Sequence, residues 1–370
     1  MSEKIWSKLI RLIQKAGGEA IPYHPILVEI LQTLITEEQA KFLHVFRKPK
    51  LTIDQIKQKT DLDGKELEKM LRDLMYEGFI TALPNENTGI MEYNLNPFVG
   101  TYAGIFERTF YRGGTSEKEK KLAHLYEKLF EELKQVVQKN YDTFVSEFKN
   151  QKPGTRIVPV EEHVDVKQQT VLPFEEITKI VEKYDTYAVG TCYCRHKQAL
   201  VGDPCKMENS GGDCLLLGKH AKFLIEHEFA KPISKEVALK MLKEAEEHGF
   251  VHTTYHDMDD PEYNEFSICS CCKCCCGNLE LYHRGLVPIN TLTSYLAKVD
   301  EGTCIGCGTC VEKCPMEAIG LEDTLAVVNE ERCIGCGICA HHCPEKAMKL
   351  NRTGLRNVFV PPPRQVEGQP

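Results

Sequence analysis

The sequence predicts an α+β protein of several domains, and three features support that fold class. Apolar residues recur at helical spacing through most of residues 1–149. Strand-like and helical segments alternate in the middle of the chain, and a motif of four cysteines occurs twice near the C-terminus. At 370 residues, with 42% hydrophobic and 27% charged residues, the chain is long enough for two or three ordinary globular domains.

The composition limits where the chain works and what it binds. Eighteen cysteines in one chain indicate a reducing compartment in which thiolates bind metal. The sequence has no run of about 18 apolar residues, and its N-terminus lacks the apolar core of a signal peptide. We therefore expect a cytoplasmic protein without a membrane span, from an organism that tolerates little oxygen. The net charge of -8 argues against nucleic acid or an anionic membrane as partner.

The first segment, residues 1–35, predicts a helix with one apolar face. Leu9, Ile10 and Ile13 recur at helical spacing, and Gly17 ends the pattern. An amphipathic helix can dock on a membrane or on a partner protein. More often such a helix packs on its own domain, and we expect that arrangement here.

Residues 36–115 predict a module of three helices and a β-hairpin, followed by a connector. Helices are expected at 37–46, 52–59 and 64–77, strands at 79–83 and 90–95, and the connector at 98–115. This order resembles a winged helix. Winged helices often bind DNA, but residues 36–95 carry nine Lys/Arg against eleven Asp/Glu. Because a DNA-binding surface needs net positive charge, we prefer a protein-docking module and keep DNA binding as the alternative.

Residues 116–152 predict one long helix. Its apolar stripe includes Leu122, Leu129 and Val137, and further aromatic and aliphatic residues widen it. The stripe fits a dimer coil, a strut between domains or a core helix packed on the preceding module, and the oligomeric state stays open. The pair Pro153-Gly154 then marks a domain boundary.

Residues 153–295 predict an α/β domain rich in cysteine. Helices are expected at 174–184, 216–227 and 234–248, and a strand at 186–189 leads directly into the first cysteines. All ten cysteines of this domain are candidate metal ligands: Cys192, Cys194, Cys205, Cys214, Cys269, Cys271, Cys272, Cys274, Cys275 and Cys276. The last six form what we call the cysteine run, residues 269–276. If the run is extended, alternation places Cys272, Cys274 and Cys276 on one face.

Three interpretations of these ten cysteines stay open. The first is a third iron–sulfur cluster bound by Cys192, Cys194, Cys205 and Cys214. Cysteines of the cysteine run could add to these ligands or replace some of them. The second is a structural zinc bound by four thiolates, and the third is a redox-active thiol pair. We favour iron–sulfur over zinc. Arg195, His196 and Lys273 lie beside these cysteines and could donate hydrogen bonds to sulfur, but we assign that role to none of them.

Residues 296–352 contain the most specific signal in the chain, a C-x2-C-x2-C-x3-C-P motif that occurs twice. The copies are Cys304, Cys307, Cys310 and Cys314, and Cys333, Cys336, Cys339 and Cys343. This spacing is typical of ligands to [4Fe–4S] clusters, whereas zinc sites and disulfides do not use the duplicated pattern. The tight curl that it requires is permitted by four glycines: Gly306, Gly308, Gly335 and Gly337.

In paired motifs of this kind the fourth cysteine binds the cluster of the other motif. We therefore assign one [4Fe–4S] cluster to Cys304, Cys307, Cys310 and Cys343, and a second to Cys333, Cys336, Cys339 and Cys314. The segment resembles a bacterial-type dicluster ferredoxin. The resemblance implies a small domain with pseudo-twofold symmetry that transfers single electrons at low potential. His341 and His342 occupy spacer positions of the second motif, and we expect them at the surface.

The middle and C-terminal parts together also resemble a group of anaerobe 4Fe-4S binding proteins. The shared features are Cys192-Tyr-Cys194-Arg195, the run Cys271-Cys272-Lys-Cys274-Cys275-Cys276 and the terminal dicluster segment. No reaction is assigned to that group, so the resemblance supports the architecture alone. Residues 353–370 predict an extended, proline-rich tail.

Nothing else in the sequence is typical of a catalytic site. There is no P-loop, no dinucleotide-binding glycine motif and no nucleophile elbow. We therefore expect an electron carrier, a low-potential relay subunit or partner of an anaerobic oxidoreductase, which binds a redox partner protein. Two alternatives remain. One is a redox-sensing winged-helix transcription regulator, and the other is a reductase whose chemistry occurs at an unusual cluster in the middle domain.

Overall fold

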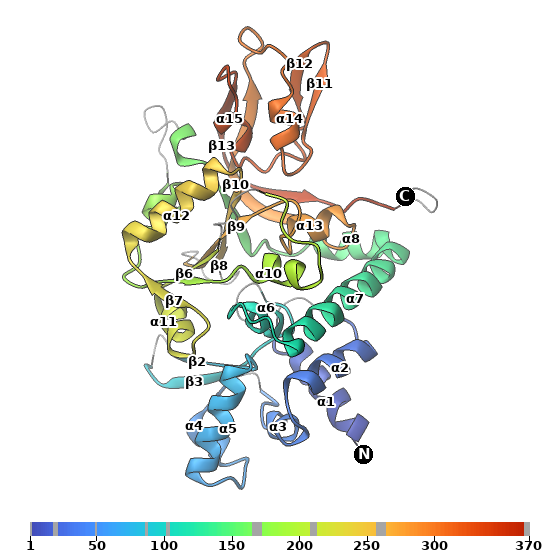
Figure 1. Cartoon of the computed structure of the whole chain (residues 1–370), viewed down its shortest axis with the longest axis vertical. Helices are drawn as coiled ribbons and strands as arrows, with labels where there is room; N and C mark the ends of the chain where they lie inside the picture. The colour runs from blue at the N-terminus through green and yellow to red at the C-terminus, as the bar shows by residue number, and fades with distance from the viewer. Residues whose placement is uncertain are drawn as a thin grey trace. The chain divides into compact units, whose positions relative to one another are not determined.

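The computed structural model describes residues 2–17, 21–48, 50–85, 88–100, 104–164, 172–207, 213–256 and 264–365 (Figure 1). The chain divides into two compact units. Unit 1 comprises Met1–Glu132, Gly190–Pro204 and Lys219–Lys231, and unit 2 comprises Leu133–Val189, Cys205–Gly218 and Pro232–Pro370. Two segments that the sequence analysis assigned to the middle domain, 190–204 and 219–231, thus belong to the N-terminal unit.

Unit 1 begins with three short helices, α1 (Ser2–Gln14), α2 (Pro25–Leu34) and α3 (Glu37–Leu43). On α1, Leu9 and Ile10 are fully buried, and the helix contacts both α2 and α3. The N-terminal helix therefore packs on its own unit, as the apolar pattern predicted.

The next part of unit 1 contains a three-stranded antiparallel sheet. Its elements in chain order are β1 (Lys50–Thr52), α4 (Ile53–Lys57), α5 (Gly64–Tyr76), β2 (Ile80–Pro84) and β3 (Met91–Leu95). In the sheet, β3 lies between β1 and β2. The apolar spacing of α5 predicts a buried face of Leu67, Met70, Leu71 and Leu74. The three leucines are buried, whereas Met70 is half-buried.

Local sequence signals account for these helices. Capping boxes begin α3 at Thr36, α4 at Thr52 and α5 at Asp63. Gly78, with a left-handed φ of 85°, separates α5 from β2. The three helices and the hairpin lie where they were predicted, whereas β1 was not predicted. Residues 86 and 87 of the predicted hairpin turn lie outside the described residues.

Four more helices belong wholly or mainly to unit 1: α6 (Ile105–Phe110), α7 (Glu117–Lys139), α10 (Tyr193–Leu200) and α11 (Gly218–Glu226). Phe106 makes edge-to-face contacts with Phe110, Tyr126 and Tyr193. The segment 98–115 was expected to be a connector, but its aromatic residues make α6 part of the core. Residues 101–103 of that segment lie outside the described residues.

Residues 116–152, predicted as one helix, form two. Helix α7 ends at Lys139, and α8 (Tyr141–Lys149) begins after Asn140, whose φ of -113° and ψ of 29° are not helical. On α7, Leu122 and Leu129 are buried, as expected for a core helix. The boundary between the units falls within α7.

Unit 2 is built on an eight-stranded sheet with the strand order β13-β10-β4-β8-β9-β6-β5-β7. The strands are β4 (Thr155–Val158), β5 (Tyr187–Gly190), β6 (Cys214–Leu217), β7 (Lys231–Ile233), β8 (Val251–His256), β9 (Glu265–Cys271), β10 (Ile289–Val299) and β13 (Met348–Val360). Every residue of β8 and β9 is buried. Residues of α9 (Ile177–Glu182) and α12 (Lys235–Glu247) form a hydrophobic cluster with residues of the sheet.

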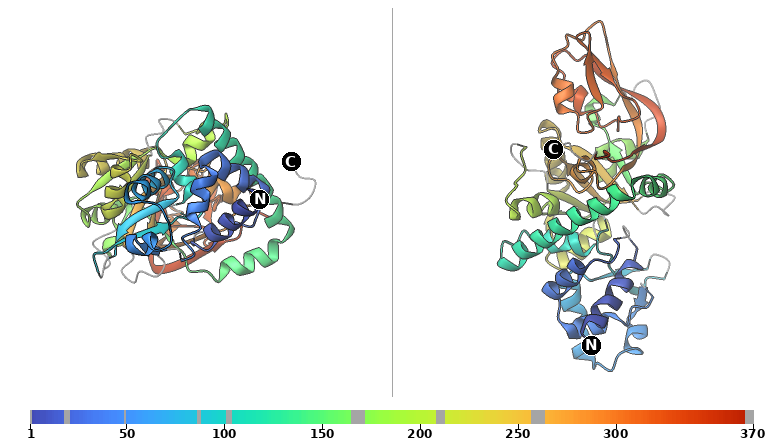
Figure 2. Two further views of the ribbon diagram at one scale, coloured as in Figure 1. Left: turned by 90° about the horizontal axis from the view of Figure 1, so that it is seen from below. Right: turned by 90° about the vertical axis from the view of Figure 1, so that its right-hand side faces the viewer.

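The segment with the two cysteine motifs is inserted between β10 and β13. These strands pair antiparallel from Ile289 and Val360 to Val299 and Met348, with a bulge near Thr293. The inserted elements are α14 (Thr309–Lys313), β11 (Ile319–Glu322), β12 (Leu325–Val328) and α15 (Ile338–His341). Figure 1 and the right-hand view of Figure 2 show this segment, orange to red, at one end of the long strands. A paired ladder, not a single-stranded linker, therefore connects it to the sheet.

The C-terminal tail is shorter than predicted, because β13 extends to Val360. The residues that follow lie against the end of α7 and the start of α8, where the Tyr141 hydroxyl donates to the carbonyl of Pro362 at 2.6 Å and Gln138 donates to the carbonyl of Pro363. Residues 366–370 lie outside the described residues. In the part of the chain that the structure describes, no helix has the length and apolar character needed to cross a bilayer.

Candidate metal centres

The cysteine run changes from a strand to a turn at its third residue. Strand β9 ends at Cys271, and residues 273–275 form a turn. The expected alternation of Cys272, Cys274 and Cys276 on one face is therefore wrong, because it requires an extended backbone throughout.

Four sulfur atoms of this region converge, and we call their residues the tetrathiol group: Cys205, Cys272, Cys274 and Cys275. All four Sγ atoms lie within 4.8 Å of one another. The Sγ of Cys205 is 3.8 Å from that of Cys272 and 3.6 Å from that of Cys274. The Sγ atoms of Cys274 and Cys275 are also 3.6 Å apart. These separations are much longer than the disulfide bond of about 2.05 Å, and all four residues are free cysteines.

Hydrogen bonds within the tetrathiol group favour a thiolate at Cys274. Bonds from Cys205, Cys272 and Cys275, together with the backbone amide of Lys206, lower the pKa of Cys274 far below its ordinary value. Hydrogen bonding to Cys272 lowers the pKa of Cys205 to about 7. Thiols that share protons so closely are suited to a metal cation, which takes the place of those protons.

The other cysteines of the predicted middle domain lie elsewhere. Cys269 contacts Cys214 and Cys271, Cys271 also contacts Cys276, and all four are buried. Cys205 and Cys214, which one interpretation assigned to a single cluster, thus lie in different groups.

Cys192 and Cys194 belong to unit 1, at the start of α10. Their neighbour Arg195 is buried, and the His196 ring contacts the carbonyl of Gly114 at 2.8 Å. Within unit 2, the candidate ligands thus form two groups, the tetrathiol group and the group of Cys214, Cys269, Cys271 and Cys276.

The first three cysteines of the first motif lie with the fourth cysteine of the second. Cys304, Cys307, Cys310 and Cys343 line one pocket. Burial raises the pKa of the Cys310 thiol, and the nearby thiolates of Cys304, Cys307 and Cys343 raise it further. These four residues are the set that the sequence analysis assigned to one cluster.

The remaining four motif cysteines form the complementary group. The thiol of Cys336 lies close enough to Cys314 and Cys333 to interact with them electrostatically. The thiol of Cys339 interacts in the same way with Cys314, Cys333 and Cys336. The fourth cysteine of each motif thus lies with the first three of the other.

Left-handed glycines shape both motifs. Gly306 and Gly335 have φ of 68° and 66°, and Gly308 and Gly337 precede α14 and α15 with φ of 78° and 82°. A Cβ added to Gly306 would lie 2.0 Å from the carbonyl oxygen of Thr324. All four glycines thus take the left-handed conformation that the predicted curl uses.

The two fourth cysteines lie in equivalent turns. The backbone amide of Ala318 donates to Cys314 Sγ and that of Ala347 to Cys343 Sγ, each at 3.3 Å. The residues before these alanines, Glu317 and Lys346, both have positive φ, 50° and 52°. The local geometry therefore repeats along with the sequence motif.

The two cysteine groups differ in exposure. Cys314, Cys333, Cys336 and Cys339 are all buried, whereas in the other group only Cys310 is buried and Cys307 is exposed. Burial raises the pKa of Cys336 and of Cys339 and so favours the neutral thiols. Thiolates at these positions would therefore need a nearby cation to stabilise their charge. The Thr309 hydroxyl, in contrast, lowers the pKa of Cys307.

A family model for the 4Fe-4S dicluster domain matches residues 297–350. The match supports the ferredoxin-like domain that the sequence predicted at 296–352, and with it iron–sulfur chemistry. Comparison of the chain with curated proteins and with solved structures gave no match. The thiolate-only donor sets of this dicluster domain fit iron, which prefers soft sulfur ligands in such clusters.

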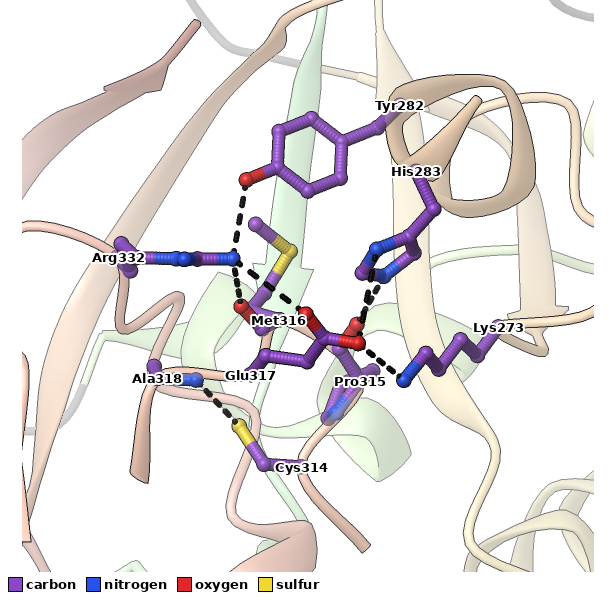
Figure 3. A network of polar contacts seen from close by, with 9 residues as sticks. All are labelled: Lys273, Tyr282, His283, Cys314, Pro315, Met316, Glu317, Ala318 and Arg332. Carbon is purple, nitrogen blue, oxygen red and sulfur yellow. Dashed lines mark hydrogen bonds and ion pairs between the residues drawn. The ribbon is translucent and has the colours of Figure 1, made fainter. Parts of the chain in front are cut away.

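A polar network connects the cysteine run with the dicluster domain (Figure 3). Lys273, which lies between Cys272 and Cys274, donates to Glu317 Oε1 at 2.6 Å. His283, on α13 (Leu279–His283), contacts the carbonyl of Pro315 through Nε2 at 2.7 Å. Arg332 donates to the carbonyl of Met316 at 2.8 Å. The turn after Cys314 is thus held by side chains from several segments of unit 2.

A smaller group of candidate ligands lies beside α15: Glu162, His163 and His341. His341 Nδ1 lies 2.6 Å from Glu162 and its side chain is only 10% exposed, so the expectation that it lies at the surface is wrong. His342 is half-buried as well. The Glu162 side chain is 59% exposed, and a hydrogen bond between the two side chains accounts for this contact.

Proposed function

We propose that this protein transfers electrons through two [4Fe–4S] clusters in the dicluster domain. One cluster is bound by Cys304, Cys307, Cys310 and Cys343, and the other by Cys314, Cys333, Cys336 and Cys339. The crosswise grouping of these cysteines carries the proposal, because ligand exchange of this kind is typical of paired motifs. The clusters, when bound, supply one-electron chemistry at low potential.

Residues of the chain itself tune such clusters. Backbone amides donate to the sulfur atoms of three ligands, from Ala297 to Cys333, from Ala318 to Cys314 and from Ala347 to Cys343. Each amide hydrogen favours the reduced cluster, because reduction adds negative charge to the sulfurs. The Arg356 guanidinium, which donates to the carbonyl of Cys333, acts in the same direction.

The difference in exposure suggests different roles for the two clusters. Ile305 and Leu321 line the pocket of the exposed group and are themselves 63% and 46% exposed. Electron transfer slows steeply with distance, so exchange with a partner is fastest at the Cys304 group. We infer that electrons enter or leave there, and that the buried Cys314 group connects this cluster with the rest of unit 2.

For residues 36–95 we propose a winged-helix fold that docks a redox partner protein. The order α3, β1, α4, α5, β2, β3, with β3 central in the sheet, supports the fold. The charge balance of nine Lys/Arg to eleven Asp/Glu favours a protein over DNA as the partner. A redox-sensing DNA-binding regulator is the second candidate, favoured by the same element order. Binding to DNA that weakens steeply with salt and changes with cluster oxidation would support that candidate.

Metal analysis after anaerobic purification tests the electron-transfer proposal. We expect about eight irons and about eight acid-labile sulfides per chain in the dicluster domain, with EPR signals from two clusters after reduction. A protein that contains no sulfide, or zinc in place of iron in both motifs, would contradict the proposal.

The crosswise ligand assignment has its own test. Cys343→Ser should change the EPR signal of the same cluster as Cys304→Ser, and Cys314→Ser that of the same cluster as Cys336→Ser. If Cys343→Ser instead affects the cluster that Cys336→Ser affects, each motif binds its own cluster and the assignment is wrong.

A further inference from the structure

We propose that the tetrathiol group binds one divalent metal ion, Zn²⁺ or Fe²⁺, in tetrahedral coordination. Its ligands would be Cys205, Cys272, Cys274 and Cys275. This site is separate from the two clusters of the dicluster domain, and it includes Cys205, one of the four cysteines that the sequence analysis assigned to a third cluster.

The sulfur separations match a single ion. A tetrahedral ion with metal–sulfur bonds of about 2.3 Å holds its sulfurs about 3.8 Å apart. The separations in the tetrathiol group are 3.8, 3.6 and 3.6 Å, and no pair exceeds 4.8 Å. Positions of this kind need little rearrangement to accept an ion.

The same chain supplies a contrast. In a cubane each thiolate binds a different iron, so the ligand sulfurs lie farther apart than around one ion. Among the described residues, the groups of candidate ligands that lie within 4.8 Å of one another are the tetrathiol group and Glu162, His163 and His341. In neither cysteine group of the dicluster domain do the sulfur atoms all lie within 4.8 Å of one another. The tetrathiol group is therefore shaped for one ion, and the motif cysteines for clusters.

The surroundings of the group are those of a structural site. Ala245 and Phe250 form a buried cluster with Cys272 and Cys275, and Met207 packs against it. The backbone amide of Lys206 donates to Cys274 Sγ at 3.5 Å, and such bonds orient thiolate ligands and reduce their charge. An apolar shell also excludes water and competing ligands.

The ion would close a long loop. Cys205 and Cys272 are 67 residues apart in sequence. A bond through metal between such distant residues restricts the unfolded chain and so stabilises the fold. It also fixes the turn from which Lys273 reaches Glu317 of the dicluster domain. We infer that the ion supports this contact.

Metal counts on the intact protein, purified anaerobically, test the proposal. We expect one zinc in addition to about eight irons, or about nine irons with the visible absorption of a single iron bound by four thiolates. Either result supports one tetrahedral ion and identifies it. About twelve irons without zinc would overturn the proposal in favour of a third cluster.

Two variants and a matched control locate the ion. Cys205→Ser and Cys274→Ser should each lose the additional ion while both EPR signals of the dicluster domain remain. Cys276→Ala removes a neighbouring buried cysteine outside the group and should keep the ion. Retention of the ion in both serine variants would overturn the assignment.

A spectroscopic probe covers the case in which the serine variants do not fold. Protein expressed with Co²⁺ should show the visible bands of tetrahedral cobalt bound by thiolates, and these bands should persist in Cys276→Ala. Their absence from cobalt-loaded wild-type protein would overturn the proposal. Because the clusters are counted by sulfide and EPR, a failure of this site is distinguishable from a failure of the dicluster assignment.

Discussion

Lys273 Nζ lies 2.6 Å from Glu317 Oε1, so a residue between two cysteines of the tetrathiol group is bound to a residue just after Cys314. The hydrogen bond from Lys273 lowers the pKa of Glu317 and keeps it ionised. The two side chains are 47% and 54% exposed, and pairs of that kind contribute only about 0–1 kcal/mol to stability. The pair matters for its position, because it connects the proposed metal ion with a proposed cluster.

Substitutions of this pair should shift the potential of the Cys314 cluster in opposite directions. Lys273→Ala removes a positive charge and should lower the potential, and Glu317→Gln removes a negative charge and should raise it. An EPR-monitored redox titration measures both effects, and the Cys304 cluster should change less.

A matched control for this prediction is Lys179→Ala. Lys179 forms a similarly exposed ion pair with Glu182, 3.1 Å apart on α9. Its loss should leave both potentials unchanged. Shifts of the same sign in Lys273→Ala and Glu317→Gln would show that the pair acts through local structure and not through charge.

The left-handed glycines should be indispensable for cluster binding. A Cβ on Gly306 would meet Thr324 O at 2.0 Å and one on Gly335 would meet Tyr295 O at 2.2 Å, so Gly306→Ala and Gly335→Ala should each lose one cluster. Iron analysis should then give about four irons in the dicluster domain instead of about eight. Gly320→Ala, in β11 with open space around its Cβ, is the control and should keep full iron. Full iron in Gly306→Ala would mean that the turn relaxes around the methyl group.

Limited exposure to air should destroy the clusters in a fixed order. The Cys304 group contains the exposed Cys307, whereas all four cysteines of the other group are buried. Oxygen should therefore remove the EPR signal that Cys304→Ser alters before the signal that Cys336→Ser alters. Loss of both signals at one rate would mean that burial of the ligands does not govern access.

Glu175 should make the stability of unit 2 depend on acid pH. Burial alone would raise the pKa of Glu175. Hydrogen bonds from Arg352, Ser294 and the Leu172 amide outweigh burial and lower the pKa below 4.5, and the two bonds from Arg352 are 2.9 and 3.0 Å long. Because the pKa in the folded state lies below that in the unfolded state, this stabilisation is complete above about pH 4.5 and is lost as the pH falls further.

Glu175→Gln tests this pH dependence by denaturant unfolding. The variant should lower the free energy of unfolding by about 2 kcal/mol at neutral pH, because the charge-assisted hydrogen bonds from the partly exposed Arg352 are weakened. The difference from wild type should shrink below pH 4.5. Glu182→Gln, at an exposed ion pair, should cost less than about 1 kcal/mol. A difference that stays constant down to low pH would rule out ionised Glu175 as the cause.

Features with a local cause could be predicted from the sequence. The spacing and glycines of the two motifs lie within a few residues of one another, and the capping boxes at Thr36, Thr52 and Asp63 define helix starts by themselves. The fold class, the dicluster domain and the helices of residues 36–77 follow from such signals.

The tetrathiol group could not be predicted, because its members come together only in the folded chain. Cys205 meets Cys272 across 67 residues, and the end of β9 at Cys271 decides which cysteines of the run turn toward it. Helical periodicity likewise continues through Asn140, so the break between α7 and α8 left no clear sequence signal. Pairing and packing between distant segments decide such features.

The long ladder of β10 and β13 brings the two ends of the dicluster segment close together. Val299 and Met348 are partners in the ladder, so the chain leaves the sheet and returns to it at neighbouring points about 5 Å apart. A two-residue turn spans that distance. With residues 300–347 exchanged for such a turn, we expect β10 and β13 to stay paired as a hairpin, which would leave the tetrathiol group without the clusters for separate study.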